Sequence, residues 1–441
     1  MIRFQSYGFA IQREQFSRPF HFKGDSFNEK WINITTLYPA ERSGDTFEKR
    51  QTAIGGNAVL WSDPAVFSSY SETGGNLVMA LMAERAVQLL RGKEYSDPIA
   101  AIQALIPELH EFGQAITGRA DLRPTFTLNS AVSLDLALWK LHAATEGFKV
   151  FSELIPREHR SAFTGRQGEV ARIPLITYNL PTAELLDLVE EGHFLLKIKI
   201  GQAGSQRQML EKDLDRLEQI HRLLRDKRTE QTDSGRLAYY LDANGRYETK
   251  ETLLGLVSGL EKMGALDQVV LLEEPFPDDR ELDVHDLPVR VAADESLHGI
   301  EDVRRKSGLG YGAVALKPAG KTLSMSILMA AEAQKQGVPS FVADSACVPL
   351  LLDWNRNVAA HLPPFPGLSS GILESNGAQN YENWAALIRD HPCAGASWLE
   401  PKGGMYWLDE SFYLSGGGIF YSAGHYEGLI QDLRQRRHYH I

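Results

Sequence analysis

Five segments decide the expected fold of this chain: LLKIKIG (195–201), YYLDANG (239–245), VLLEEPF (270–276), RVAADES (290–296) and AVALKPA (313–319). Each contains a short apolar run of the kind that forms a buried strand. The stretches between them are long enough to hold a helix. Such alternation is typical of a (β/α) barrel, in which all strands end on one face and supply the catalytic groups there. We therefore expect the charged residues at the ends of these runs to meet in one site.

Strand and helix signals alternate from residue 172 to residue 375. Helical patterns include residues 205–226 and 322–337, and the second opens on Thr322 as a candidate N-cap. Eight strand signals match the number in the common closed barrel. The sequence therefore predicts an α/β fold with a modified TIM-type (β/α) barrel of about eight strands. The predicted strands are ITYNL (176–180), FLLKIKI (194–200), LAYYLDA (237–243), VVLLEEP (269–275), VRVAADE (289–295), GAVALK (312–317), PSFVAD (339–344) and GILES (371–375).

Three units are expected along the chain. Residues 1–125 combine alternating segments with a helical run at 76–92, which predicts an N-terminal α+β capping domain. Residues 126–375 carry the repeated strand and helix pattern of the catalytic barrel. Residues 376–441 are rich in aromatic residues and Gly and lack that pattern. We expect this C-terminal segment to pack back on the capping domain and complete it.

The composition argues against several classes of protein. At 441 residues, with 43% hydrophobic and 23% charged residues, the chain is an ordinary globular sequence. Its net charge of −11 lacks the excess of Lys and Arg that nucleic acids and anionic membranes attract, so we expect neither as a partner. Two cysteines, no signal-peptide pattern and no apolar run of membrane length favour a cytoplasmic location. The expected partner is a small-molecule carboxylate substrate, and assembly into a homo-oligomer is left open.

The charged residues at the strand ends suit one kind of chemistry. Asp242, Glu273 and Asp294 would come from three successive strands and could surround one ion from one side. Oxygen donors without a nearby Cys or His are the set that a hard divalent cation such as Mg²⁺ prefers. Lys199 and Lys317 would come from the second and sixth strands and flank these carboxylates. Two amines beside a substrate chelated to the metal suggest proton transfer.

In order and spacing, these residues resemble the enolase superfamily, and within it the muconate lactonizing enzyme subgroup. That subgroup includes muconate cycloisomerases, o-succinylbenzoate synthases, N-succinylamino acid racemases and dipeptide epimerases. The resemblance covers roughly residues 126–375. The motifs that carry it are Lys197-Ile198-Lys199 followed by Gly201, Asp242-Ala243-Asn244, Glu273-Glu274-Pro275, Asp294-Glu295-Ser296 and Lys317-Pro318.

The resemblance implies roles for six side chains. Three would bind Mg²⁺, with Mn²⁺ as the alternative ion, and two lysines would act as acid and base. A third lysine, Lys197, is included with them in the catalytic set. The implied metal ligands are Asp242, Glu273 and Asp294. The implied acid and base are Lys199 and Lys317.

Four further polar residues are candidates for binding substrate or supporting the metal ligands. They are Asn244, Glu295, Asp344 and Glu374. Dipeptide epimerases of the subgroup usually carry an Asp-x-Asp pair at the eighth strand that holds the substrate ammonium, whereas this chain has Glu374-Ser375-Asn376. One carboxylate of that pair therefore remains available for an amine-bearing substrate.

The predicted activity is Mg²⁺-dependent abstraction of the α-proton of a carboxylate substrate through a metal-stabilised enediolate. Racemisation or epimerisation of an amino-acid derivative or dipeptide is favoured, because two opposed lysines permit deprotonation on one face and reprotonation on the other. The alternative is β-elimination or cycloisomerisation of the o-succinylbenzoate synthase or muconate cycloisomerase kind. More distant alternatives are a serine hydrolase, since residues 367–371 match Gly-x-Ser-x-Gly, and a non-catalytic binding barrel.

Overall fold

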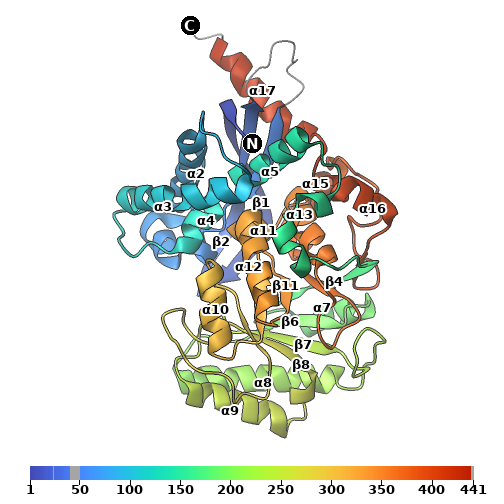
Figure 1. The fold of residues 1–441 in the computed structure, drawn as a ribbon. Helices are drawn as coiled ribbons and strands as arrows, with labels where there is room; N and C mark the ends of the chain where they lie inside the picture. The colour runs from blue at the N-terminus through green and yellow to red at the C-terminus, as the bar shows by residue number, and fades with distance from the viewer. Residues whose placement is uncertain (23, 40–49, 439–441) are drawn as a thin grey trace.

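The computed structural model describes all residues except 23, 40–49 and 439–441, which lie in the predicted N-terminal and C-terminal units. The described chain forms an antiparallel sheet with its helices and a mostly parallel barrel sheet (Figure 1). The N-terminal helices α2 and α3 lie on one side of the barrel in this view, and α15 and α16 lie on the other.

The N-terminal sheet has three strands in the order β1-β2-β3. The first two form a long hairpin, in which Phe4 lies opposite Pro39 and Phe22 lies opposite Asp25 near the tip. The central strand is buried from residue 29 to residue 37, which is the burial expected of a strand covered on both faces. The strands are β1 (Phe4–Phe22), β2 (Asp25–Pro39) and β3 (Gln51–Gly56).

Helices follow this sheet and connect it to the barrel. Helix α2 starts after Asp63, whose carboxylate caps its first turn by accepting from Val66 N at 3.2 Å. Helix α5 packs closely on the sheet, because a Cβ at Gly55 would lie only 2.7 Å from Ser133 N. The helices are α1 (Val59–Ser62), α2 (Pro64–Leu90), α3 (Pro98–Thr117), α4 (Pro124–Ser130), α5 (Val132–Glu146), α6 (Phe151–Leu154) and the 3-10 helix η2 (Arg157–Ala162).

The second sheet has the order β13-β4-β12-β11-β10-β9-β8-β7-β6-β5, and only the β13 pairing is antiparallel among the described strands. The predicted α/β fold with a modified TIM-type barrel is confirmed. The strands are β4 (Glu169–Ile173), β5 (Leu175–Ile176), β6 (Leu195–Lys199), β7 (Ala238–Asp242), β8 (Val269–Glu273), β9 (Val291–Ala293), β10 (Ala313–Leu316), β11 (Ser340–Val342), β12 (Gly371–Glu374) and β13 (Met405–Trp407).

A proline divides the first barrel strand and lets it join both ends of the sheet. Strand β4 pairs with β12, β5 pairs with β6, and only Pro174 separates β4 from β5. Proline has no N–H for a ladder, so a break at this position loses little pairing. The predicted first strand (176–180) therefore lies too far along the chain. Pairing ends at Ile176, and the next residues form a turn before Pro181.

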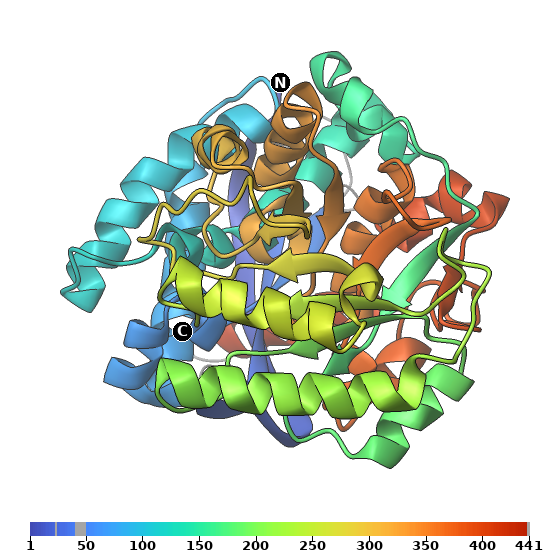
Figure 2. The same cartoon turned by 90° about the horizontal axis from the view of Figure 1, so that it is seen from below.

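Helices cover the outside of most barrel crossovers, but residues 274–290, between β8 and β9, form turns without a helix. Helices α8 and α9 lie side by side (Figure 2), and a Cβ at Gly259 would lie 2.3 Å from a methyl group of Leu214. The predicted N-cap is confirmed, since Thr322 Oγ1 accepts from Met325 N at 3.2 Å. The helices are α7 (Thr182–Glu190), α8 (Gln206–Leu224), α9 (Lys250–Lys262), η3 (Leu266–Gln268), α10 (Ile300–Gly308), α11 (Pro318–Lys321), α12 (Leu323–Lys335) and α13 (Pro349–His361).

The C-terminal segment returns to the N-terminal sheet. Helix α17 packs on β1 at Gly8, where a Cβ would lie 2.6 Å from Ile430 Cγ2. Near the middle of β1, the rings of Phe16 and Tyr381 meet edge to face at 5.0 Å. The remaining helices are α14 (Gly377–Asn380), α15 (Trp384–Arg389), α16 (Glu410–Ser415), η4 (Gly416–Gly418) and α17 (Gly424–His438).

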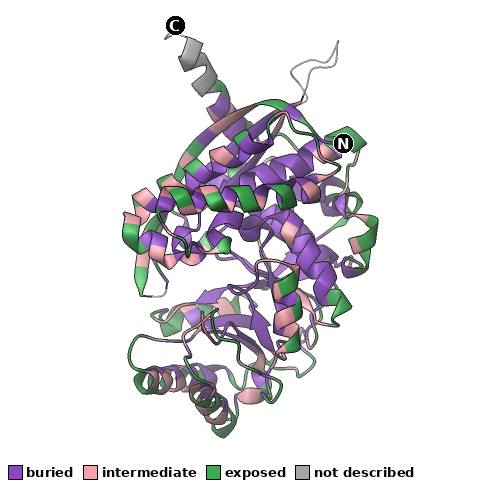
Figure 3. Ribbon diagram, turned by 60° about the vertical axis from the view of Figure 1, so that its left-hand side comes forward, coloured by how far each residue is buried: buried purple, intermediate pink, exposed green. Residues whose placement is uncertain are grey.

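The pattern of burial distinguishes the barrel interior from the outer surface of its helices. The strands are mostly buried, and exposed residues gather on the outer sides of the helices (Figure 3). Among the described helices, none combines the length and the apolar character needed to cross a membrane.

A buried carboxylate joins α5 to the start of α12. Asp135 Oδ2 accepts from Leu323 N at 2.7 Å and from Ser324 N at 3.3 Å. Burial raises the pKa of Asp135 to about 7, despite these hydrogen bonds. An unfolded Asp releases its proton at lower pH, so the folded state should lose relative stability as pH rises from about 4 to about 7.

We expect wild type to lose on the order of 3–4 kcal/mol of unfolding free energy over this pH range relative to Asp135→Asn. Asparagine cannot titrate but retains an oxygen that can accept from the α12 backbone. Urea unfolding of both proteins at several pH values measures the difference. Parallel pH profiles would contradict the raised pKa of Asp135.

Candidate active site

Two adjoining cavities lie at the ends of the barrel strands, under the tip of the β1–β2 hairpin. The inner cavity has a volume of about 60 Å³ and the outer cavity about 240 Å³. Phe20 and Phe22 of the hairpin line both, as do Leu175, Lys199 and Asn244. The N-terminal unit therefore forms one wall of the space into which the strand ends point.

Lys199 and Lys317 line the inner cavity from opposite sides of the barrel. Lys199 ends β6 and Lys317 follows β10, four strands further around a barrel of eight. Lys199 Nζ lies 2.5 Å from Asp242 Oδ2, and Lys317 Nζ lies 2.5 Å from Asp294 Oδ2. The ring centroid of Trp61 is 4.0 Å from Lys317 Nζ. Each predicted acid or base thus contacts a carboxylate that was predicted to bind metal.

Lys197 lies among three carboxylates and is 3% exposed. Its Nζ is 2.9 Å from Asp242 Oδ2, 2.7 Å from Glu273 Oε2 and 3.0 Å from Glu374 Oε2. Burial lowers the pKa of Lys197, but the three carboxylates outweigh burial and raise this pKa well above its usual value. The charged form of Lys197 is therefore favoured where this side chain lines the inner cavity.

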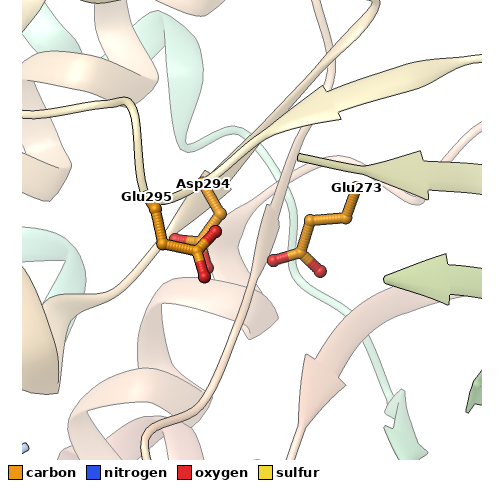
Figure 4. A group of neighbouring side chains, drawn as sticks. All are labelled: Glu273, Asp294 and Glu295. Carbon is orange, nitrogen blue, oxygen red and sulfur yellow. The ribbon is translucent and has the colours of Figure 1, made fainter. Parts of the chain in front are cut away.

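Glu273, Asp294 and Glu295 form a buried group of carboxylates that could hold a metal ion. One oxygen from each lies within 4.8 Å of the others, and Figure 4 shows Glu273 pointing toward the other two. Glu273 Oε1 and Glu295 Oε2 are buried without a hydrogen-bond partner among the described residues. Unpartnered buried oxygens of this kind fit a hard divalent cation such as Mg²⁺. Asp242, the third predicted ligand, instead contacts Lys197 and Lys199.

The acids differ in the direction of their pKa shift, according to which positive charges lie beside them. Burial opposes ionisation of Asp242, but Lys197 and Lys199 outweigh burial and lower its pKa to about 2. Lys317 likewise helps to hold the pKa of Asp294 below its usual value against the effect of burial. By contrast, burial and the nearby Asp242 raise the pKa of Glu273. A cation between Glu273 and Asp294 would favour the ionised form of both.

The candidate supporting residues lie in the same region. Asn244 accepts from Lys199 and donates from Nδ2 to Glu295 Oε1 at 2.7 Å, so it connects the lysine to the acidic cluster. Asp344 lines the inner cavity and accepts from two backbone N–H groups, those of Cys347 at 3.1 Å and Asn376 at 3.0 Å. Its carboxylate thereby holds together the loops after β11 and β12.

Glu374 shares one oxygen between two partners. Its Oε2 accepts from Lys197 Nζ at 3.0 Å and from Asp344 N at 3.1 Å. Asn376, at the second position of the epimerase-type pair, also lines the inner cavity. This part of the site therefore has one carboxylate that is already paired and one neutral amide.

Lys321, Trp61 and Lys30 are among the cavity and cluster residues that were not predicted. Lys321 is fully buried, donates to the Asp294 carbonyl oxygen and lies 3.3 Å from Asp294 Oδ1. Trp61 and Lys30 reach the inner cavity from the N-terminal unit. The sequence did carry a signal for Lys321, because this charged residue stands four positions after Lys317 in an otherwise apolar stretch. No local pattern points to Trp61 or Lys30, because they meet the barrel only in the folded chain.

Unusual backbone conformations gather at the strand ends. Asn244, Glu274, Thr322 and Ala346 have φ values of 44°, 39°, 72° and 53°, and each follows a barrel strand or its first helical turn. Non-glycine residues rarely adopt positive φ, and such strain often occurs at functional sites. Of the four, Asn244 and Ala346 line the inner cavity, whereas Glu274 and Thr322 contact backbone N–H groups.

Glu274 positions the segment that carries Asp294 and Glu295. Its Oε2 accepts from Asp294 N at 2.7 Å and from Ser296 Oγ at 3.1 Å. Loss of such a contact typically costs about 10- to 100-fold in metal affinity. We expect Glu274→Ala to weaken Mg²⁺ binding to that extent while Glu274→Gln retains more of it, as measured by calorimetry. Equal Mg²⁺ affinity in Glu274→Ala and wild type would show that Glu274 is not needed to position the segment that carries Asp294 and Glu295.

Barrel, antiparallel cap and charged strand ends together define a fold of the enolase type. Residues 182–369 match the family model described as enolase C-terminal domain-like. The matched residues belong to the barrel, so this part of the chain is similar to the enolase superfamily. The expected resemblance is confirmed at that level. A comparison with curated protein sequences gives no match.

Solved structures share this fold at low sequence identity. A mandelate racemase/muconate lactonizing protein from Herpetosiphon aurantiacus is 18% identical, with a TM-score of 0.64 over 92% of this chain and 96% of that one. A dipeptide epimerase from Enterococcus faecalis V583, complexed with Mg and L-Leu-L-Tyr, is 16% identical, with a TM-score of 0.60 over 94% and 99%. The L-Ala-D/L-Glu epimerase from Bacillus subtilis is 14% identical, with a TM-score of 0.59 over 86% and 92%.

Proposed function

We propose that this enzyme abstracts the α-proton of a carboxylate substrate with the help of Mg²⁺ and racemises or epimerises an amino-acid derivative or dipeptide. The observation that carries this proposal is the placement of Lys199 and Lys317 on opposite sides of one cavity. Two amines on opposite faces of an α-carbon can remove a proton from one side and return one from the other.

The acidic residues fit the charge that such a reaction develops. Glu273, Asp294 and Glu295 would hold the ion, with Asp242 as a further ligand after release of its lysine contacts. When bound, Mg²⁺ would neutralise negative charge on the substrate carboxylate as the α-proton leaves. Lys197, held protonated by its carboxylates, would add a fixed positive charge near the same oxygens.

β-Elimination or cycloisomerisation is the second candidate, and the surroundings of Lys317 favour it. Asp294 raises the pKa of Lys317 against the opposing effect of burial, and Trp61 stacks on its ammonium. A lysine held as ammonium suits charge stabilisation better than proton abstraction. In that reaction Lys199 alone would act as the base.

The hydrolase alternative lacks the necessary geometry. Ser369 of the Gly-x-Ser-x-Gly match is exposed, contacts Gln231 and precedes β12. A nucleophile elbow requires the serine between a strand and a following helix.

The test is NMR in D₂O with Mg²⁺, scanning dipeptides, N-acyl amino acids and hydroxy acids for exchange of the α-proton. We expect exchange that EDTA abolishes, with inversion of configuration for the true substrate. Metal-dependent exchange without inversion would favour elimination or cycloisomerisation. Absence of exchange throughout a broad panel would argue against α-proton chemistry and for a binding barrel.

A further inference from the structure

Lys30 is a buried cation on the wall of the inner cavity. It lies on β2 of the N-terminal sheet, is 1% exposed and lines the cavity together with Asp294 and Lys317 from the barrel. The aromatic residues Phe20, Phe22, Phe27 and Trp61 line the same cavity. An ammonium group therefore faces the reaction site from the capping side, within an otherwise largely apolar wall.

This ammonium lacks a close counter-ion. Its described hydrogen bond goes to the carbonyl oxygen of Ser345, and among the described residues no carboxylate oxygen lies within 4.0 Å. Burial lowers the pKa of Lys30 and Lys317 lowers it further, although Cys347 and Asp344 act in the opposite direction. A buried ammonium with one neutral acceptor is costly unless a ligand brings negative charge.

The backbone is shaped to admit this side chain. A Cβ at Gly56 on the neighbouring strand β3 would lie 2.5 Å from Lys30 Cε and 3.3 Å from Nζ. Because Gly56 has no side chain, Lys30 can lie across β3 with its ammonium at the cavity. Gly56→Ala should displace that ammonium without removing it.

We propose that Lys30 binds a second negatively charged group of the substrate, so that the enzyme selects a compact dicarboxylate. The inference rests on the proposed function, since the first carboxylate is the one held at the acidic cluster. The inner cavity of about 60 Å³ favours a short link between the two carboxylates. Lys197, Lys199 and Lys317 already contact protein carboxylates, which leaves Lys30 as the lysine suited to this role among those that line the cavity.

Binding of glutarate and of its monoamide, measured by calorimetry with Mg²⁺, tests the assignment without turnover. The two probes are nearly isosteric and differ in one negative charge. We expect wild type to prefer glutarate by about 10- to 100-fold and Lys30→Met to lose that preference. Gly56→Ala should reduce the preference as well, which keeps the test available if Lys30→Met fails to fold.

Lys140→Met is the matched control, because Lys140 is also buried and donates to a backbone carbonyl, that of Tyr421 at 2.9 Å, but does not line the inner cavity. It should keep the preference for glutarate. Equal binding of both probes by wild type, or an unchanged preference in Lys30→Met, would overturn the assignment.

The α-proton exchange assay separates this inference from the proposed function. Pairs such as L-Ala-L-Glu and L-Ala-L-Gln differ only in the second charge. Exchange that is equally fast for both members would retain the α-proton chemistry and remove the role of Lys30. Charge-selective binding by Lys30 without any α-proton exchange would retain the role of Lys30 and remove the α-proton chemistry.

Discussion

Replacing Lys199 or Lys317 with alanine is expected to abolish racemisation, with a rate loss of about 10²- to 10⁴-fold. The two amines lie on opposite sides of the cavity, so in the proposed mechanism each would serve one enantiomer as base and the other as acid. Each variant should therefore exchange the α-proton of one enantiomer only. NMR in D₂O with each enantiomer supplied separately measures this selectivity.

Lys335→Ala is the control for these variants, because Lys335 lies on α12 with its side chain 61% exposed, and it should leave the rate unchanged. Circular dichroism checks that the variants fold, since each substitution removes a cation from a buried ion pair. Full racemisation by either Lys199→Ala or Lys317→Ala would refute the two-base mechanism. Exchange that depends on Lys199 for both enantiomers would favour the elimination or cycloisomerisation alternative.

Asp294→Asn is expected to weaken Mg²⁺ binding by at least about 100-fold. It removes a charged oxygen from the acidic cluster and leaves Lys317 and Lys321 without the carboxylate that they share. Loss of one partner from a buried ion pair costs about 3–5 kcal/mol, so the metal-free variant should also be less stable. Thermal unfolding with increasing Mg²⁺ measures both effects, because a ligand that binds only the folded state raises its midpoint.

Asp353→Asn separates loss of a ligand from general destabilisation. Asp353 is fully buried, ion-paired with Arg356 and hydrogen-bonded to His391, outside the two cavities. Its replacement should lower the unfolding midpoint but leave the upward shift with Mg²⁺ intact. An equal Mg²⁺ shift in wild type and Asp294→Asn would remove Asp294 from the ligand set.

Local pattern was sufficient for the barrel and for the positions of its charged residues. All eight predicted strands overlap a strand of the barrel, although the first does so only at Ile176, because apolar runs of four to eight residues report burial directly. The error at 176–180 arose because Pro174 splits the first strand, so the apolar run did not coincide with the pairing. Strand ends on one face of a barrel converge, and this rule alone brought Lys199, Asp242 and Lys317 to one cavity.

Tertiary structure decided which side chains meet inside that site. Glu295 joins Glu273 and Asp294 while Asp242 contacts the lysines, an outcome that strand periodicity does not reveal. Lys30 reaches the same cavity from a sheet far away in the chain. By itself, the sequence determined the barrel and most of the acids and amines at its mouth, because both follow from local burial. Only the tertiary structure determined their pairing and the shape of the cavity, because loop geometry and contacts between the cap and the barrel join residues that share no local pattern.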